Sequence, residues 1–219
     1  MAHIPTAAPE LPGRDCPLCP RLAAFRQENR RLYPDFFNAP VPPFGELSAR
    51  LLVVGLAPGL KGANRTGRPF TGDYAGDLLY ATLLKFGFAR GSYDRRPDDG
   101  LALADARITN AARCVPPENK PTPAEVATCR RFLIGELACM PNLRAIVALG
   151  SVAHASVIAA LGGRQAAHKF AHGARHEPRA GLALFDSYHC SRYNTNTGRL
   201  TTEMFESVFA AVRRHVDAG

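Results

Sequence analysis

Short apolar runs alternate along this chain with longer segments of helical periodicity. The apolar runs are residues 51–54, 106–109, 145–149 and 182–185. Runs of this length bounded by turn residues predict strands, whereas the segments between them space their apolar residues as amphipathic helices do. Strands that alternate with helices predict an α/β fold, with a parallel central sheet of about four strands and helices on both faces.

Helix boundaries can be read in several of the periodic segments. Thr122-Pro123-Ala124-Glu125 is a capping box with proline at the first helical position, so a helix is expected to begin there. We expect further helices at residues 16–31, at 76–86, at 151–162 and from Thr201 onward.

Proline-rich stretches indicate which N-terminal segments are not helical or strand-like. Residues 1–13 are rich in proline and alanine and are expected to be frayed, and residues 33–46 hold four prolines in an extended arm. The chain of 219 residues can bury a sizeable core without disulfides. We therefore expect a flexible N-terminus at 1–14 and a single domain at 15–219.

Polar loops follow each predicted strand. They span residues 55–73, 110–119, 150–151 and 187–199, and in a parallel sheet they meet at one rim, where ligands bind. The first is glycine-rich but is neither common nucleotide loop, because Leu60 stands where a phosphate loop needs glycine and no Gly-x-Gly-x-x-Gly occurs. We expect the chemistry of the protein in this loop.

Charge favours a polyanionic partner such as nucleic acid. The formal net charge is +8, and only four of the 27 basic residues are lysines. Arginine suits bidentate phosphate contacts, although a base-composition bias in the genome gives the same excess. The N-terminus lacks the pattern of a secretory signal, and no run of about 18 apolar residues occurs, so we expect a cytoplasmic protein without a membrane partner.

Four of the six cysteines have the spacing of metal ligands. Cys16 and Cys19 form a C-x2-C pair, and Cys114 and Cys129 supply two further thiols. Such a set can close a four-thiolate site for zinc or for an iron–sulfur cluster, although Cys129 also lies on an apolar helix stripe and suits a core position. The other two do not stand at ligand spacing from another cysteine and are expected in the core; they are Cys139 and Cys190.

Five motifs along the chain belong together. They are Cys-Pro-Leu-Cys at 16–19, Ala-Pro-Val-Pro-Pro-Phe-Gly at 39–45, the loop 55–73, the stretch 109–123 and His-Cys-Ser-Arg-Tyr-Asn-Thr-Asn-Thr-Gly-Arg-Leu-Thr at 189–201. Taken together, these motifs resemble the uracil-DNA glycosylase superfamily, and most closely its family 5, the type-B enzymes. They lie in collinear order over residues 16 to about 209. Family 4, the nearest relative, carries an acidic residue in its first motif, where this chain has Leu56 and Ala57.

The resemblance implies a monofunctional DNA repair glycosylase. Such an enzyme flips uracil, or another deaminated base such as hypoxanthine, out of DNA and hydrolyses its N-glycosidic bond, leaving an abasic site. It also implies a structural 4Fe-4S cluster that ties an N-terminal arm to the domain. The implied ligands are Cys16, Cys19, Cys114 and Cys129.

Roles for the rim residues follow from the same resemblance. His189 would hydrogen-bond the departing base, and Asp73 would position water or stabilise the sugar cation, although aspartate before a helix is also a preferred N-cap. Phe70 would stack on the flipped base and Asn110 would read its edge, with Gly55 and Ala57 completing the base-binding group. The small Ala57 leaves room for bases larger than uracil.

Basic and polar residues around these motifs are candidate DNA contacts. They are Arg65, Arg68, Ser191, Arg192, Tyr193 and Arg199. Of the remaining histidines, His3 falls in the frayed N-terminus, and the others are expected to be surface or helix residues: His154, His168, His172, His176 and His215.

Two other functions fit parts of this pattern. Loss of the first-motif acid favours a non-catalytic iron–sulfur protein that binds DNA, and the four thiols alone would suit a small electron-transfer protein. A redox protein needs neither the loop 55–73 nor a basic surface. We therefore expect a glycosylase that acts on DNA as a monomer.

Overall fold

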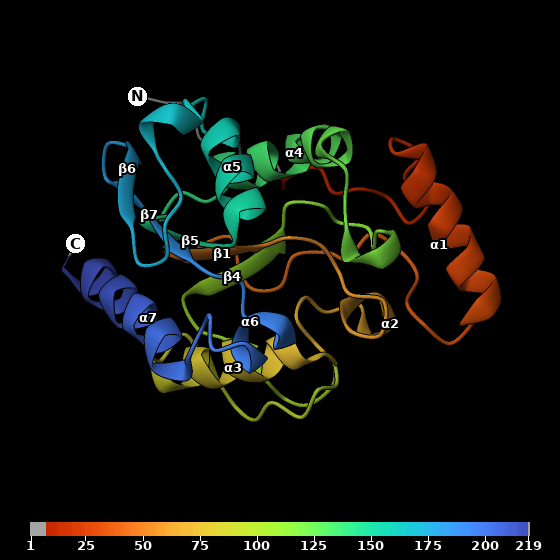
Figure 1. Cartoon of the computed structure of the whole chain (residues 1–219), viewed down its shortest axis with the longest axis horizontal. Coiled ribbons are helices and arrows are strands. Elements are labelled where there is room, and N and C mark those ends of the chain that lie inside the picture. The colour runs from red at the N-terminus through yellow and green to blue at the C-terminus, as the bar shows by residue number, and fades with distance from the viewer. Residues whose placement is uncertain (1–7, 219) are drawn as a thin grey trace.

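The structure is a computed structural model that describes residues 8–218. At its centre lies a five-stranded sheet in the order β4-β1-β5-β7-β6 (Figure 1). Four strands are parallel, namely β1 (Leu51–Gly55), β4 (Ala106–Asn110), β5 (Ala145–Leu149) and β7 (Leu182–Ser187). They coincide with the four predicted apolar runs, so the predicted α/β fold is confirmed.

A fifth strand, β6 (Arg175–Arg179), was not predicted. It pairs antiparallel with β7 at the edge of the sheet, with an irregular register between His176 and Arg179. Its sequence is polar and contains Pro178, and exposed and half-buried residues alternate along it. Edge strands tolerate both features because one side of the strand faces no partner. A polar edge strand such as β6 contains no apolar run, so the apolar pattern does not predict it.

Helices cover both faces of the sheet (Figure 1). Leu51 and Val53 of β1 pack into one core and Leu52 and Val54 into the other, because successive side chains of a strand point to opposite faces. The helices are α3 (Tyr74–Lys85) and α7 (Thr202–Asp217) on the first face, and α4 (Pro123–Ala138) and α5 (Ser151–Ala160) on the second.

Local chemistry sets where the helices begin. The capping box predicted for α4 is present, with reciprocal hydrogen bonds between Thr122 and Glu125. Helix α1 (Pro20–Leu32) begins later than predicted, since Cys19 is its N-cap and Pro20, which lacks an N–H, occupies the first turn. Cys16 therefore lies in the segment before the helix.

Short elements in the loops are too brief for a periodicity pattern to predict. They are α2 (Ala63–Thr66), α6 (Arg192–Asn196), the turns η1 (Pro117–Asn119) and η2 (Gln165–Ala167), and a hairpin of β2 (Ala89–Arg90) and β3 (Ala102–Leu103).

The proline-rich arm runs along β4. Within it, Phe44 forms an isolated antiparallel bridge with Ile108, and the Val41 N–H donates to the Arg113 carbonyl at 2.7 Å. The prediction of fraying at 1–13 falls partly on residues outside the described range, as does His3; residues 8–13 form neither helix nor strand. Within residues 8–218 no helix is both long and apolar enough to cross a membrane.

A buried ionic group joins α4 to β4. Glu136 is fully buried, and its carboxylate lies 2.5 Å from Nε of Arg107 and 2.5 Å from Nη2 of Arg113. Both guanidiniums are themselves buried, so one carboxylate compensates two charges that have left water.

We predict that Glu136→Gln lowers the free energy of unfolding by about 3–5 kcal/mol, because it leaves two buried guanidiniums without a counter-charge. The measurement is urea unfolding followed by circular dichroism. Glu206→Gln is the matched control, since Glu206 pairs with the exposed Lys85 on the surface and its loss should change little. Equal effects of the two substitutions would contradict this account.

Candidate active site

Loops from three parallel strands meet in one pocket at the carboxyl rim of the sheet. The pocket is lined by Ala57, Pro58, Gly59, Ala63, Phe70, Asp73, Ala75, Asn110 and His189. Five of these were singled out from the sequence, and they come from segments that are distant along the chain. The free cavity at this position is small, about 30 Å³.

The pairing of β1 with β4 sets the floor of the pocket. Gly55 lies opposite Asn110 in register, and a side chain at Gly55 would clash with the Asn110 amide and would approach the Phe70 ring to 2.5 Å. Asn110 is buried, and its Oδ1 has no hydrogen-bond partner within residues 8–218. A buried amide oxygen left unpaired costs about 1–3 kcal/mol, so the pocket holds an acceptor ready for a ligand.

Phe70 is held in a strained backbone conformation. Its φ is +53°, a region that bulky residues rarely adopt. The Tyr80 hydroxyl donates to the Pro69 carbonyl at 2.6 Å, and the Tyr93 hydroxyl donates to the Phe70 carbonyl at 3.2 Å. Gly76 lies so close beneath that a side chain there would clash with the Phe70 carbonyl. These contacts fix the ring in the pocket wall, with its centroid 5.9 Å from that of His189.

Asp73 lies at the start of α3 and also lines the pocket, so its place in the fold is compatible with both roles considered from the sequence. It is the N-cap of α3, where its Oδ1 accepts a hydrogen bond from the Gly76 N–H at 3.3 Å. Its Oδ2 lies beside Gly62 and Gly59, so that the Cβ of a side chain introduced at Gly59 would be 3.1 Å from this oxygen, and Asp73 is among the residues that line the pocket. Burial raises the pKa of the Asp73 carboxyl, and the backbone N–H groups at the helix start partly oppose that rise.

His189 is a neutral imidazole in this environment. Burial lowers its pKa to about 4, so at pH 7 the ring carries a single N–H. The backbone around it is held from both sides, because Asn194 donates from its amide to the His189 carbonyl at 2.8 Å and the Tyr188 N–H donates to Nδ1 of His172 at 3.1 Å. The ring is therefore a positioned, uncharged hydrogen-bond donor.

Most of the candidate DNA contacts lie exposed beside the pocket. Arg65, Arg192, Tyr193 and Arg199 are exposed, with Tyr193 at 72 %. Ser191 instead caps α6, since its hydroxyl accepts from the Asn194 N–H.

Arg68 has a structural role that replaces the predicted DNA contact. It is buried, and its guanidinium makes a bidentate ion pair with Asp99 at 2.7 and 2.8 Å. It also lies over the rings of Tyr80 and Tyr93 at 5.4 and 5.8 Å. Arg68 holds the pKa of Asp99 well below its usual range. The residue therefore braces the two tyrosines that support Phe70, and we leave it out of the DNA surface.

The four ligand-spaced cysteines line a second cavity, between α1, the loop after β4, and α4. Arg26 Nη1 donates to the Cys114 sulfur at 3.5 Å, and the Arg113 N–H donates to the Cys129 sulfur at 3.3 Å. Burial raises the pKa of the Cys114 thiol to about 12 and also raises those of Cys19 and Cys129.

Two buried arginines beside the thiols favour an anionic occupant. Nε of Arg26, and Nε and Nη1 of Arg113, have no hydrogen-bond partner in the described part of the chain. Thiolates that share a metal centre carry negative charge and accept N–H groups, so the donor set and its surroundings fit such a group. The two remaining cysteines differ: Cys190 is fully buried, as predicted for a core residue, whereas Cys139 is only half-buried at the end of α4.

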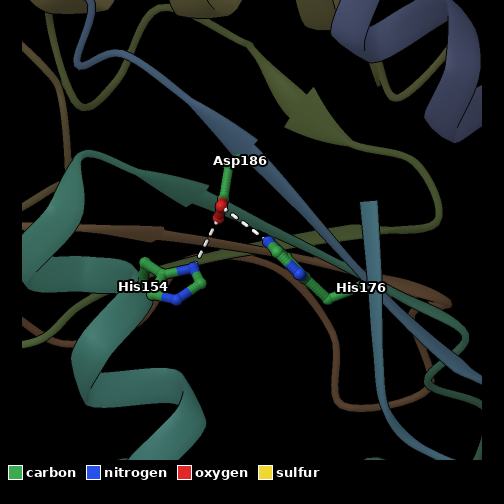
Figure 2. A group of neighbouring side chains, drawn as sticks. All are labelled: His154, His176 and Asp186. Atoms are coloured by element: carbon green, nitrogen blue, oxygen red, sulfur yellow. Dashed lines mark hydrogen bonds and ion pairs between the residues drawn. The ribbon is translucent and has the colours of Figure 1, made fainter. Parts of the chain in front are cut away.

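One polar group was not predicted from the sequence. His154 is buried in α5, His176 points inward from β6, and both lie within hydrogen-bond distance of the fully buried Asp186 (Figure 2). The expectation of a surface or helix position is therefore wrong for His176, which lies half-buried in a strand, and is confirmed for His154, which lies in α5. The available signal was a carboxylate directly after the apolar run 182–185, because a carboxylate that continues a buried strand needs partners.

Comparison with known proteins identifies the family of this chain. A family model described as the uracil DNA glycosylase superfamily matches residues 42–213. A type-5 uracil-DNA glycosylase of Thermus thermophilus is 46% identical over 204 residues, covering 91% of this chain and 93% of the relative. One of Pyrobaculum aerophilum is 42% identical over 209 residues, covering 94% and 90%. A type-4 enzyme of Thermotoga maritima is 38% identical over 110 residues, covering 50% and 49%. The predicted resemblance is thus confirmed, and the chain belongs to the uracil-DNA glycosylase superfamily.

Proposed function

We propose that this protein removes uracil from DNA by hydrolysing the bond between the base and the sugar, leaving an abasic site. One observation carries the proposal. A single rim pocket combines an immobilised aromatic ring, an unpaired buried amide, a neutral histidine and a buried carboxylate, in a chain whose relatives are named type-5 uracil-DNA glycosylases.

Base recognition falls to Phe70 and Asn110. A base stacked within a duplex is out of reach, so the nucleotide must flip into the pocket. There the ring of Phe70 stacks on the base, and the Asn110 amide, which both donates and accepts, matches the amide-like edge of uracil. The cost of the unpaired Asn110 oxygen is relieved when uracil donates to it.

Bond rupture falls to His189 and Asp73. As the glycosidic bond breaks, its electron pair leaves with the base and the sugar gains positive charge. The neutral His189 ring donates its N–H to the oxygen of the departing anion, and Asp73 Oδ2 stabilises the cation or orients the attacking water. Water then bonds to the sugar carbon, and the proton that it loses balances the one gained by the released uracil.

Exposed side chains at the rim fit the sugar–phosphate backbone. Arg65, Arg192 and Arg199 would contact phosphates, and the exposed ring of Tyr193 would enter the duplex. Arg192 and Arg199 already lie over the rings of Tyr74 and Tyr188, at 5.4 and 4.6 Å, which orients both guanidiniums.

We also propose that Cys16, Cys19, Cys114 and Cys129 hold a 4Fe-4S cluster. The support is the cavity that they share and the unpaired guanidinium nitrogens beside it. When bound, the cluster supplies a cross-link among three segments of the chain rather than a step of the hydrolysis. Zinc is the other occupant that four thiols accept.

We predict that His189→Ala and Asp73→Asn each lower the single-turnover rate of uracil excision by about tenfold to a thousandfold, while the affinity for uracil-containing duplex changes little. Each group acts mainly on charge that develops in the transition state. Asparagine is as good an N-cap as aspartate, so Asp73→Asn should keep its melting temperature.

Matched controls for these variants are His215→Ala and Asp77→Asn, because Asp77 lies in the same helix turn but pairs with the exposed Arg95. Unchanged excision by a well-folded Asp73→Asn protein would reduce Asp73 to a helix cap. A wild-type protein that binds the duplex without excising uracil would favour the non-catalytic DNA-binding alternative.

We predict that the excision rate shows no step near pH 6.5, the ordinary titration range of histidine. With a pKa of about 4, His189 stays neutral as the pH falls from about 8 to 6 and keeps its donor. A decline at a pH above the titration of His189 reflects protonation of Asp73, whose pKa is raised, and is absent from the residual activity of Asp73→Asn. A pH–rate profile under single-turnover conditions tests this, and a step near 6.5 shared by both proteins would contradict it.

We predict that duplexes containing hypoxanthine are also substrates, because Ala57 places only a methyl group in the pocket wall. Ala57→Tyr should then reduce excision of hypoxanthine far more than excision of uracil, since the larger base needs the wall to open further. The ratio of the two single-turnover rates is the measurement. A ratio that Ala57→Tyr leaves unchanged would show that Ala57 does not set base size.

We predict about four irons per chain and broad absorbance near 400 nm in protein purified without oxygen. Cys114→Ser should lower the melting temperature by about 10 °C or more, because it loosens a metal cross-link in the folded state. Cys139→Ser, which lies outside the cavity, is the control and should have a much smaller effect. Stoichiometric zinc without iron would replace the cluster by the zinc alternative.

A further inference from the structure

Three side chains from three elements converge on one buried point away from both cavities described above. Oδ1 of Asp186 lies 2.7 Å from Nδ1 of His154, and its Oδ2 lies 3.0 Å from Nε2 of His176. Figure 2 shows both rings pointing at the carboxylate, one from α5 and one from β6. One ligand atom from each residue lies within 4.8 Å of the others.

The contact of the other ring nitrogen of His154, Nε2, determines which atom this histidine can offer to a ligand. Its Nε2 lies 2.7 Å from the carbonyl oxygen of His168, which can only accept a hydrogen bond. Nε2 therefore carries a hydrogen, and Nδ1 is the nitrogen that faces the carboxylate, with one hydrogen shared between Nδ1 and Oδ1 of Asp186. A cation can take the place of that shared hydrogen.

We propose that His154, His176 and Asp186 bind one zinc-type divalent cation. A cation on Nδ1 of His154 replaces the proton there and leaves the Nε2–H on the His168 carbonyl, the usual outer contact of a metal-bound histidine. Two imidazoles and a carboxylate are a donor set that zinc accepts, with a fourth position for water. Their burial and the mixed nitrogen and oxygen donors distinguish this site from the four-thiol cavity.

Binding balances with the release of one proton. The hydrogen between Nδ1 of His154 and Asp186 leaves, whereas His176 moves the hydrogen on Nε2 to Nδ1. The ion enters past His176, whose side chain is 13% exposed on the edge strand. Once bound, it ties α5, β6 and β7 together just before the segment that carries His189. The proposal stands whether or not the protein excises uracil.

The probe is zinc chloride alone, added to the whole protein with its cysteine-bound metal left in place. Zinc is counted per chain after equilibrium dialysis, and calorimetry in buffers of different ionisation enthalpy counts protons. We expect one zinc per chain with Kd at or below about 1 µM and about one proton released. His176→Asn should weaken binding by at least about tenfold, whereas His215→Asn, a histidine outside the group, should not.

Zinc held at the cysteines would survive His176→Asn, so equal binding by that variant and the wild type would overturn the proposal. Binding only in the millimolar range, or binding without proton release, would do the same. If His176→Asn fails to fold, diffraction from zinc-soaked wild-type crystals at the zinc absorption edge replaces it. A peak among the three side chains supports the site, and its absence there overturns it.

Discussion

The in-register pairing of β1 with β4, which ends at Gly55 opposite Asn110, is the constraint on which the site depends. The missing side chain at Gly55 leaves the space that the Asn110 amide and the Phe70 ring occupy. A shift of the register by one residue would turn Asn110 to the other face of the sheet. Backbone hydrogen bonds of the sheet thus place Asn110. Phe70 lies in the loop after β1, where the hydroxyls of Tyr80 and Tyr93 hold its backbone.

Two buried arginines, Arg68 and Arg113, support the residues on either side of this strand pair. Arg68 pairs with Asp99 and packs on the tyrosines whose hydroxyls hold the strained Phe70 backbone. On the other side, Arg113 pairs with Glu136 through its side chain and donates from its backbone to the Cys129 sulfur. Because Asn110 and the Cys114 thiol belong to one short segment at the end of β4, a metal bound at the cysteines would also restrain the pocket floor. A metal at the cysteines would then influence the hydrolysis by stabilising the pocket floor, although it takes no part in the reaction itself.

The parts that could be predicted best from the sequence are those set by local pattern. The four buried strands, the capping box at Thr122 and the convergence of the rim loops follow from apolar runs, cap chemistry and strand direction. The parts that were missed depend on contacts between distant segments. The edge strand β6 gains its place only by pairing with β7, and nothing local marks Arg68 as buried until Asp99 is opposite it. The histidines around Asp186 likewise needed the three-dimensional arrangement, although the acid in an apolar strand indicated that partners exist.

The central claim is that the rim pocket receives a flipped uracil. The most direct measurement is a crystal structure of the protein with a duplex that carries 2′-fluoro-deoxyuridine, whose glycosidic bond resists cleavage. The account predicts the base within the pocket, stacked on Phe70, with its edge on the Asn110 amide and a ring oxygen near His189. A base that stays stacked in the duplex, or that lies outside these residues while the protein still excises uracil, would contradict it.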